Sequence, residues 1–286
     1  MKTIHYLAVV MISLRLFSSS TWAQDLPAFM TPDPNTPSPI EVYDTVFIEE
    51  MTWMEVRNAL RAGKTTVIIA TGGVEQNGPY VATGKHNYTL LATTDAIARK
   101  LGDALVAPIV PFVPEGRIDP PSGHMRYPGT ISVKPETFQR LLTDIASSFK
   151  AHGFKHIILI GDSRGNQVGM QAVADTLSTE WPTDSTSIHY ISEYYNAHPV
   201  LPQNKWLETQ GIHEVDEGLH DNFVSSAILM TVDPNLVRMQ QRIKANKFSI
   251  NGVNLAPSER TIEIGKRAVE YLTEKTVVAI QKAIGK

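Results

Sequence analysis

Side chains that could bind a metal ion or move protons gather in four loops of this chain. The first loop, residues 72–87, follows the β-branched run 66–70 and contains Glu75, Asn77 and His86. A buried strand that ends in glycines delivers such side chains to the carboxyl edge of a sheet, where ligands bind in open α/β folds. A carboxylate and an imidazole in one loop are suited to metal binding or to acid–base chemistry. A solvated glycine-rich turn is the alternative interpretation.

The second loop, residues 115–130, places His124 among glycines and prolines, with Arg126 two residues later. This pattern is typical of a loop that faces a substrate, because arginine binds carboxylate and carbonyl oxygens well. A structural loop whose histidine bonds to the backbone fits the same residues.

The third loop begins with Asp162, directly after the apolar run 156–160. Asp162 could cap the following helix or pair with Arg164. It could also be a metal ligand or a general base. Chemistry at this position would use a carboxylate at the mouth of a helix.

The same loop has the letters of a Gly-x-Ser-x-Gly nucleophile elbow around Ser163, although no HGGG-type oxyanion motif is evident. An acidic residue, Asp216 or Glu217, and then His220 follow in the chain order of a serine hydrolase. A serine hydrolase therefore stays open as an alternative.

The fourth loop, residues 213–222, is dense in imidazoles and carboxylates, and Asp221 leads into an apolar helix. Such oxygen and imidazole groups suit zinc, manganese or iron. Side chains at a helix start are held rigidly, which favours a functional interpretation over a solvated acidic loop.

Strands alternate with helices along the chain, which predicts an α/β fold with a mainly parallel central sheet flanked by helices. We find no internal repeat and no second hydrophobic core. The expected strands are 66–70, 106–110, 156–160 and 187–191, and the expected helices are 49–62, 88–101, 135–152, 167–180, one starting at 223, and one from 257 or 258 to about 284.

Composition excludes several classes of function. The formal net charge of -3 gives no electrostatic case for nucleic-acid binding. The absence of cysteine excludes disulfides, thiolate metal ligands and a cysteine nucleophile. A metal would have to be held by histidine, carboxylate, amide or water.

The first residues are typical of an export signal, with Lys2, a short apolar run and small residues before a cleavage site after Ala23. We therefore expect a signal peptide at 1–23, a proline-rich extended lead-in at 24–44 and a single domain at 45–286. The mature protein would be periplasmic or secreted, with no membrane contact after cleavage.

The four loops together resemble motifs of the creatininase (creatinine amidohydrolase) family. Residues 75–86 are similar in register to Glu-Gln-His-Gly-Pro-His-x-Pro-x-Gly-Thr-Asp, and residues 124–130 to His-x-x-Phe-Pro-Gly-Thr. Residues 161–166 resemble Asn-Gly-His-Gly-Gly-Asn, and residues 220–226 resemble, more loosely, a segment before a Thr-Ser helix start. The resemblance runs from about residue 45 to the end and implies the family's three-layer α/β fold.

The resemblance implies a zinc or manganese site that activates water to attack a cyclic amide. Glu75 matches a ligand of the family's two-metal centre. Asn77 and Ser163 replace two of its histidines, and His86 replaces its bridging aspartate. We therefore expect one metal, held by a set drawn from Glu75, His86, Asp162, His220 and Asp221, with an open position for water.

The predicted function is an exported, metal-dependent hydrolase that cleaves a C–N bond of a small polar molecule, with cyclic amides among the candidate substrates. The expected catalytic residues are His220, Glu217 and His124, and the expected substrate-binding residues are Asn77, Arg126, Asn166 and Ser163. The resemblance also implies a homo-oligomer, commonly a hexamer. The alternatives are a metal-free acid–base or serine-type hydrolase on the same scaffold and a non-catalytic binding protein.

Overall fold

The structure is a computed structural model that describes residues 31–182 and 185–286. The expected signal peptide and the first part of the lead-in lie outside these residues. Residues 40–286 form one compact unit, separate from residues 1–39, and only this larger unit is described below. Within the described ranges, no helix is long and apolar enough to cross a membrane.

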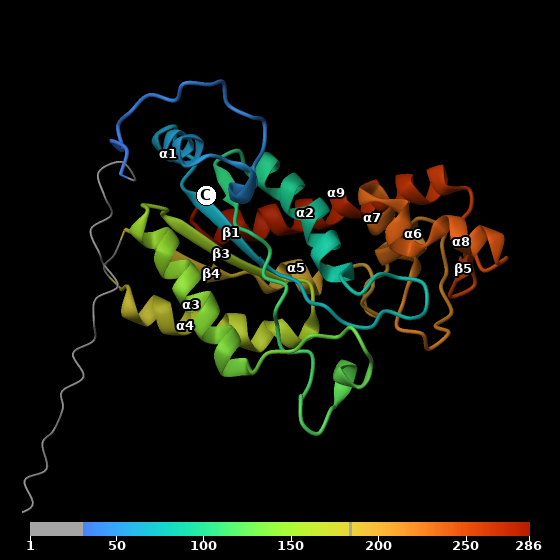
Figure 1. The fold of residues 1–286 in the computed structure, drawn as a ribbon. Helices are drawn as coiled ribbons and strands as arrows, with labels where there is room; N and C mark the ends of the chain where they lie inside the picture. The colour runs from blue at the N-terminus through green and yellow to red at the C-terminus, as the bar shows by residue number, and fades with distance from the viewer. Residues whose placement is uncertain (1–30, 183–184) are drawn as a thin grey trace, which may run out of the picture. The chain divides into compact units, whose positions relative to one another are not determined.

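A four-stranded parallel sheet forms the centre of the unit, in the order β2-β1-β3-β4 (Figure 1). Its strands are β1 (Thr66–Thr71), β2 (Ala104–Val106), β3 (His156–Gly161) and β4 (Ser187–Tyr190). This confirms the predicted fold class.

Strand β2 is displaced from the expected 106–110, because Pro108 has no N–H to donate to a ladder and Val110 makes only an isolated bridge to Thr71.

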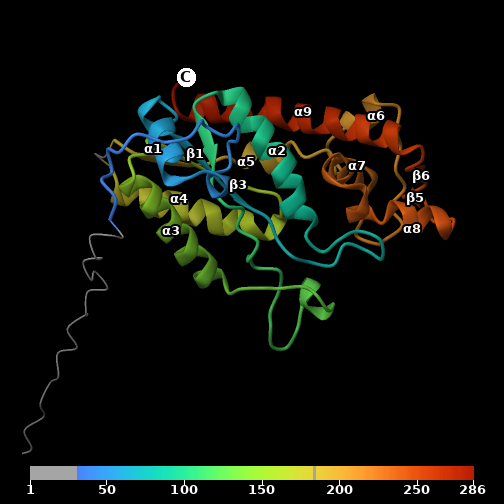
Figure 2. The ribbon, with the colours of Figure 1, turned by 45° about the horizontal axis from the view of Figure 1, so that its top comes forward.

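Helices cover both faces of the sheet, which gives three layers (Figure 2). Helices α1 (Trp53–Arg61), α3 (Pro135–Ala151) and α4 (Gln167–Glu180) contribute to the apolar cluster on one face. Helices α2 (Lys85–Leu101) and α9 (Ser258–Ala283) contribute to the cluster on the other face.

Alternate residues of each strand point to opposite faces, so Val67 belongs to the first cluster and Ile68 to the second. Both faces are buried, and this explains why the strands read as continuous apolar runs.

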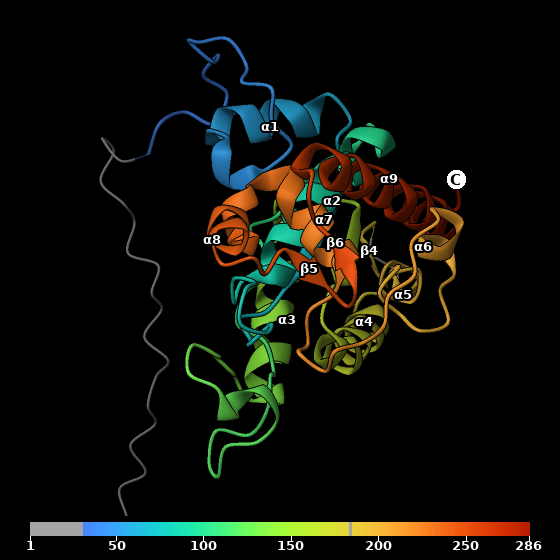
Figure 3. The ribbon, with the colours of Figure 1, turned by 90° about the vertical axis from the view of Figure 1, so that its right-hand side faces the viewer.

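A third apolar cluster lies around α7 (Phe223–Val232), away from the sheet. The short helix α8 (Met239–Lys244) and the hairpin of β5 (Ser249–Ile250) and β6 (Val253–Asn254) belong to this region (Figure 3). The expectation of no second core was therefore wrong. Two short helices, α5 (Ser192–Asn196) and α6 (Trp206–Thr209), lie between β4 and α7, where no helix was expected.

The strand order places two loop-bearing strand ends side by side. The chain passes from β1 outward to β2 and then returns to β3 on the other side of β1, so the sheet has a topological switch point between β1 and β3. Thr71 is paired with Gly161 at the carboxyl end of these strands. Ligands of open α/β sheets bind at such a crevice, and the first and third loops both start there.

Helix α2 begins at Lys85, three residues earlier than the sequence predicted. Lys85 and His86 therefore lie on its first turn, beside the loop that follows β1. Helix α1 begins at Trp53, four residues later than expected, because Ile48–Glu50 form a separate 3-10 turn and a capping box starts the helix after Thr52. The Thr52 hydroxyl accepts a hydrogen bond from the Glu55 N–H, and the Glu55 carboxylate accepts one from the Thr52 N–H.

Candidate metal and substrate site

Glu75 is the centre of the candidate site. Its side chain is only 3% exposed, and it lines a pocket of about 1020 Å³ at the carboxyl edge of the sheet. Oε1 of Glu75 lies 2.7 Å from Nε2 of His86, and Oε2 lies 3.3 Å from Nε2 of His124. Each carboxylate oxygen thus faces a different imidazole. The two sides of Glu75 have different surroundings, which we call the buried side and the open side.

On the buried side, His86 lies between two carboxylates. Its Nδ1 is 2.6 Å from Oδ2 of Asp162, and its Nε2 is 2.7 Å from Oε1 of Glu75. Ionised carboxylates only accept hydrogen bonds, so both ring nitrogens donate and His86 is an imidazolium. Burial and the charge of Lys85 oppose this charge, but the hydrogen bonds to Asp162 and Glu75 outweigh them and raise the pKa of His86.

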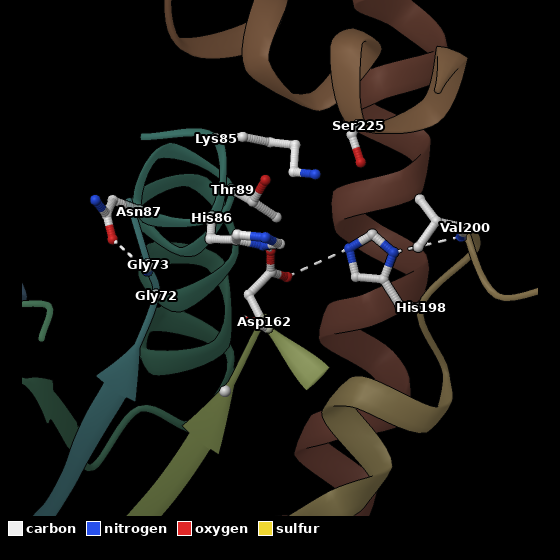
Figure 4. A network of polar contacts seen from close by, with 12 residues as sticks. Gly72, Gly73, Lys85, His86, Asn87, Thr89, Asp162, His198, Val200 and Ser225 are labelled. Atoms are coloured by element: carbon white, nitrogen blue, oxygen red, sulfur yellow. Dashed lines mark hydrogen bonds and ion pairs between the residues drawn. The ribbon is translucent and has the colours of Figure 1, made fainter. Parts of the chain in front are cut away.

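Asp162 has further partners behind His86. Its Oδ1 accepts a hydrogen bond of 3.1 Å from the Tyr194 hydroxyl and lies 3.4 Å from Nε2 of His198 (Figure 4). Nδ1 of His198 accepts from the Val200 N–H, which leaves the ring proton on Nε2 and directed at Asp162. Burial raises the pKa of Asp162, but the hydrogen bonds from His198 and His86 outweigh it and hold that pKa well below its usual range.

On the open side, His124 and His220 approach Glu75 from two loops. Their side chains are 30% and 42% exposed, and their ring centroids are 4.5 Å apart. Nε2 of His220 lies 3.9 Å from Oε1 of Glu75. The backbone of His220 is in the left-handed region, with φ 61°, which is uncommon for a residue other than glycine and typical of functional sites.

The tautomer of His220 leaves a lone pair for a ligand. Its Nδ1 lies 2.9 Å from the carbonyl oxygen of Gln76, so Nδ1 carries the proton and donates it. Burial and the charge of Lys85 lower the pKa of His220, which keeps the ring neutral. Metal-bound histidines usually donate their second N–H in this way.

Glu75, His124 and His220 fit a divalent metal ion. One ligand atom of each lies within 4.8 Å of the others. A carboxylate and two imidazoles with an open position form a donor set of catalytic zinc sites. His86 does not fit as a ligand, because both its ring nitrogens already donate to carboxylates. Asp162 is likewise occupied by His86, Tyr194 and His198, so these two predicted ligands support Glu75 from behind.

Two further ionisable groups lie beside Glu75. Nζ of the buried Lys85 is 3.7 Å from Oε1 of Glu75. Burial and the charge of Glu75 raise the pKa of Glu115 to about 8, so its carboxyl group is protonated at neutral pH. Burial raises the pKa of Glu75 too, but the hydrogen bond and charge of His86 and the charge of Lys85 outweigh it, so the pKa of Glu75 is low.

Glycines after β1 allow these close approaches. A Cβ on Gly72 would come within 2.0 Å of Oδ1 of Asn87, the oxygen that accepts the Gly73 N–H. A Cβ on Gly73 would come within 2.2 Å of Oε1 of Glu115. The Gly-Gly pair is therefore needed for packing against α2 and for placing Glu115 next to the site.

Two amides predicted to bind substrate instead hold the backbone. Asn77 is buried, and its Nδ2 donates to carbonyl oxygens of its own loop, including that of Glu75 at 3.0 Å. Asn166 is fully buried, and its Nδ2 donates to Gly72 and Thr71 at the end of β1. Neither amide lines the pocket in the described structure. They position the loop that carries Glu75.

Arg126 and Glu217 also lie outside the lining of the pocket. Arg126 is exposed, and its Nε donates to the Gly123 carbonyl 3.3 Å away. Glu217 is exposed, and Oε1 accepts the Gly252 N–H. Their predicted roles, in substrate orientation and proton transfer, are therefore not part of the proposal below.

Ser163 and Asp221 do line the pocket. Among the described residues, no histidine hydrogen-bonds the Ser163 hydroxyl, so the serine-hydrolase alternative has no base in place. Both carboxylate oxygens of Asp221 are buried without a hydrogen-bond partner in this part of the chain, and Asp221 is not in the group around Glu75 that fits a metal.

Sequence reasoning missed four residues of the site: Lys85, Glu115, Tyr194 and His198. Lys85 and Glu115 lie in the first and second of the four loops. The available signal was that Lys85 directly precedes His86. Tyr194 and His198 lie in and after α5, far along the chain from Asp162, so no local pattern links them. Only the folded sheet brings them together.

The chain is thus an α/β protein with a parallel sheet, and a Glu–His–His group that could hold a metal ion lies at the switch point of this sheet. The profile of one family, described as "Creatininase: Creatinine amidohydrolase", matches residues 49–280. The chain belongs to this family. This confirms the resemblance inferred from the motifs.

Two curated relatives match part of the chain. A 3-dehydro-scyllo-inosose hydrolase of Thermotoga maritima is 29% identical over 40% of this chain and 35% of its own length. A creatinine amidohydrolase of Pseudomonas putida is 25% identical over 43% of this chain and 47% of its own length. The chain therefore spans less than half the length of either relative.

Solved creatininase structures share the fold. A mutant creatininase complexed with creatine superposes with a TM-score of 0.63 at 18% identity, over 85% of this chain and all of the other. A second structure, described as a manganese creatininase, superposes with a TM-score of 0.59 at 19% identity, over 84% of this chain and 98% of the other. A third, a mutant creatininase of Zn-Zn type, superposes with a TM-score of 0.60 at 19% identity, over 85% of this chain and all of the other. Together with the Glu75–His124–His220 group, they support a divalent metal.

Proposed function

We propose that this chain is a metal-dependent hydrolase that cleaves a C–N bond of a small polar molecule, and that Glu75, His124 and His220 hold one zinc or manganese ion. The observation that carries this proposal is the convergence of these three side chains at the pocket, with the lone pair of His220 left free by its bond to Gln76. A bound divalent metal would supply an activated water and polarise a carbonyl group.

The residues of the chain would keep the ligands in place. His86 and Lys85 interact with the same oxygen of Glu75, Oε1, so Oε2 is the oxygen that stays available on the side of His124. Asp162 in turn fixes His86. Carboxylates that ligate metals are commonly held by such outer hydrogen bonds.

Hydrolysis needs a bond to form and a bond to break. The water oxygen bonds to the carbonyl carbon while the π pair of the carbonyl moves onto its oxygen. This pair returns as the C–N bond breaks, and the nitrogen takes a proton. The Glu115 carboxyl group lines the pocket and interacts with Glu75, so we assign the transfer of this proton to it; the proton that the attacking water loses then restores the Glu115 carboxyl group.

The test is metal content, measured by elemental analysis of the protein from residue 24 onward after zinc or manganese loading. We expect about one ion per chain, and loss of that ion in both His124→Ala and His220→Ala. The matched control is His213→Ala, because His213 is an exposed histidine of the same segment as His220. No uptake by the unaltered protein, or equal uptake by all three variants, would contradict the proposal.

The substrate is to be sought among small cyclic molecules. The panel should contain creatinine and other cyclic amides, and also cyclic inososes, because the relatives' names include hydrolases of both kinds. Amide turnover that depends on His220 supports C–N hydrolysis. Metal binding with turnover of inososes alone would contradict C–N hydrolysis and indicate a hydrolase of inosose-type substrates, and ligand binding without turnover would favour a non-catalytic relative.

We also propose that the protein is exported and forms a homo-oligomer, as the N-terminal pattern and the family resemblance indicate. Expression of the full chain in a bacterium and N-terminal sequencing of the product should give Gln24 as the first residue. Light scattering of the purified product should give a mass of several chains, with six as the expectation. An uncleaved product or a monomer would contradict the respective proposal.

A further inference from the structure

Two hydrogen-bond donors lie close together beside the candidate metal site: Lys85 lines the pocket, and Ser225 lies directly behind its lining. Lys85 on the first turn of α2 and Ser225 on the first turn of α7 extend toward each other above His86 and His198 (Figure 4). Both residues are buried, with 6% and 5% of their surfaces exposed. They come from elements 140 residues apart in sequence, so the fold rather than a local motif creates the pair.

The two donors have few partners within the protein. Nζ of Lys85 pairs with Oε1 of Glu75 at 3.7 Å, which exceeds hydrogen-bond distance. Among the described residues, no hydrogen bond of the Ser225 hydroxyl is found, although the Ser225 N–H donates to Asn222. An ammonium group at this distance from its counter-ion and a hydroxyl without an acceptor can both donate to an acceptor that enters the site.

The charges around Glu75 also favour an incoming oxygen. Glu75 and Asp162 carry two negative charges, and Lys85 and His86 balance them with two positive charges. A divalent metal on the open side would leave this inner group with an excess of positive charge. An oxygen that becomes negative during a reaction would be stabilised there, because preorganised donors act most strongly in a site shielded from water.

We propose that Lys85 is a further catalytic residue, which with Ser225 donates hydrogen bonds to the carbonyl oxygen of the substrate as this oxygen becomes negative. The proposal rests on the proposed function. The substrate would be a carbonyl compound that lies over Glu75, with its oxygen toward α2 and α7 and its carbon toward His124 and His220. The bonds that form and break are those of the hydrolysis described above. Lys85 only donates a hydrogen bond and transfers no proton.

The test uses acetate as the probe, because its carboxylate has the single negative charge of such an oxygen. Acetate titrations of the zinc-loaded protein, followed by the line width of carbon-13 acetate, should show at least tenfold weaker binding in Lys85→Met and at least threefold weaker binding in Ser225→Ala. The matched control is Lys100→Met, since Lys100 is an exposed lysine of the same helix that pairs with Glu274. It should bind acetate as the unaltered protein does.

Zinc affinity, measured first in every variant, separates catalysis from positioning. Lys85→Met should bind zinc as well as the unaltered protein or better, because a positive charge near Glu75 is lost. Acetate affinity within twofold of the unaltered protein, no acetate binding by the unaltered protein, or loss of zinc from Lys85→Met would each overturn the proposal. If the unaltered protein takes up no zinc, the proposed function fails, and the same titrations without metal still decide whether Lys85 and Ser225 form a donor site.

Discussion

The two sides of Glu75 contain the same kinds of residue but differ in what their polar atoms already bind. On the buried side, His86 gives both ring nitrogens to carboxylates, and Asp162 receives three partners. On the open side, His124 and His220 are partly exposed, and His220 keeps a free ring nitrogen. Residue type alone therefore does not make a metal ligand, because a ligand also needs an unshared lone pair.

The largest effect should come from breaking the buried side at Asp162. Asp162→Asn removes the charge that pairs with His86, and loss of one partner of a buried ion pair typically costs about 3–5 kcal/mol. We expect a decrease of this size in the free energy of unfolding, measured in denaturant without metal. Asp175→Asn, which changes an exposed aspartate of α4, should stay within about 0.5 kcal/mol. A small effect at Asp162 would mean that this side is not a structural ion-pair network.

The second comparison asks whether His86 is a ligand or a support. His86→Gln should still bind one zinc ion per chain, but about 10–100-fold more weakly, as is typical when an outer partner of a metal ligand is lost. Zinc titration with a competing chelator measures this. Complete loss of zinc from His86→Gln, with zinc retained in His124→Ala, would reverse the assignment of the two sides.

A smaller effect is expected at Tyr194, which supports Asp162 through one neutral donor. Tyr194→Phe removes the hydroxyl that donates to Oδ1 of Asp162 and hydrogen-bonds Oγ1 of Thr93 at 3.0 Å, and it leaves His86 and His198 in place. A hydrogen bond contributes about 1 kcal/mol, or somewhat more when its acceptor is charged, so we expect a loss of about 1–2 kcal/mol. Denaturant unfolding should show this loss, with zinc affinity unchanged within threefold. A decrease as large as that of Asp162→Asn would show that Tyr194 has a further structural role.

Local patterns account for what the sequence predicted well. The apolar run of β3 and the amphipathic helix α3 depend on neighbours in the chain, and the structure contains both elements. The marked loops also meet at the switch point, because the alternation of strands and helices requires a parallel sheet.

The division of labour within the site was not predictable in the same way. His86 and His220 are both histidines in polar loops, and nothing local shows that His86 will lie between two carboxylates. Asp162 meets Tyr194 and His198 only through the packing of α5 against the sheet. Asn166 was expected to bind substrate, but it is buried at the end of β1, where its side chain donates hydrogen bonds to the backbone of Thr71 and Gly72. The burial of a side chain and the number of its hydrogen-bond partners depend on the tertiary fold. These two properties distinguish the residues that can bind a metal from those that hold the ligands in place.

The smallest and most direct comparison is the titration of His86 against that of His220 in the metal-free protein. Hydrogen bonds to Asp162 and Glu75 raise the pKa of His86 despite burial and Lys85, whereas burial and Lys85 lower that of His220. The ordinary pKa of histidine is 6.5. Nitrogen-15 spectra of labelled histidines should therefore show that His86 loses its proton above pH 6.5 and that His220 loses its proton below pH 6.5. His86→Gln and His220→Gln assign the signals.

The two shifts also affect stability with opposite signs. The charged form of His86 is favoured in the folded state, so its contribution is complete below pH 6.5 and is lost as the pH rises through its raised pKa. The neutral form of His220 is favoured, so its contribution is present above pH 6.5 and is lost as the pH falls through its lowered pKa. His86→Gln should remove the alkaline loss of stability and leave the acid loss at His220. Shifts in the same direction for both rings would contradict the distinction between the two sides of Glu75, because that distinction depends on one ring being charged and the other neutral.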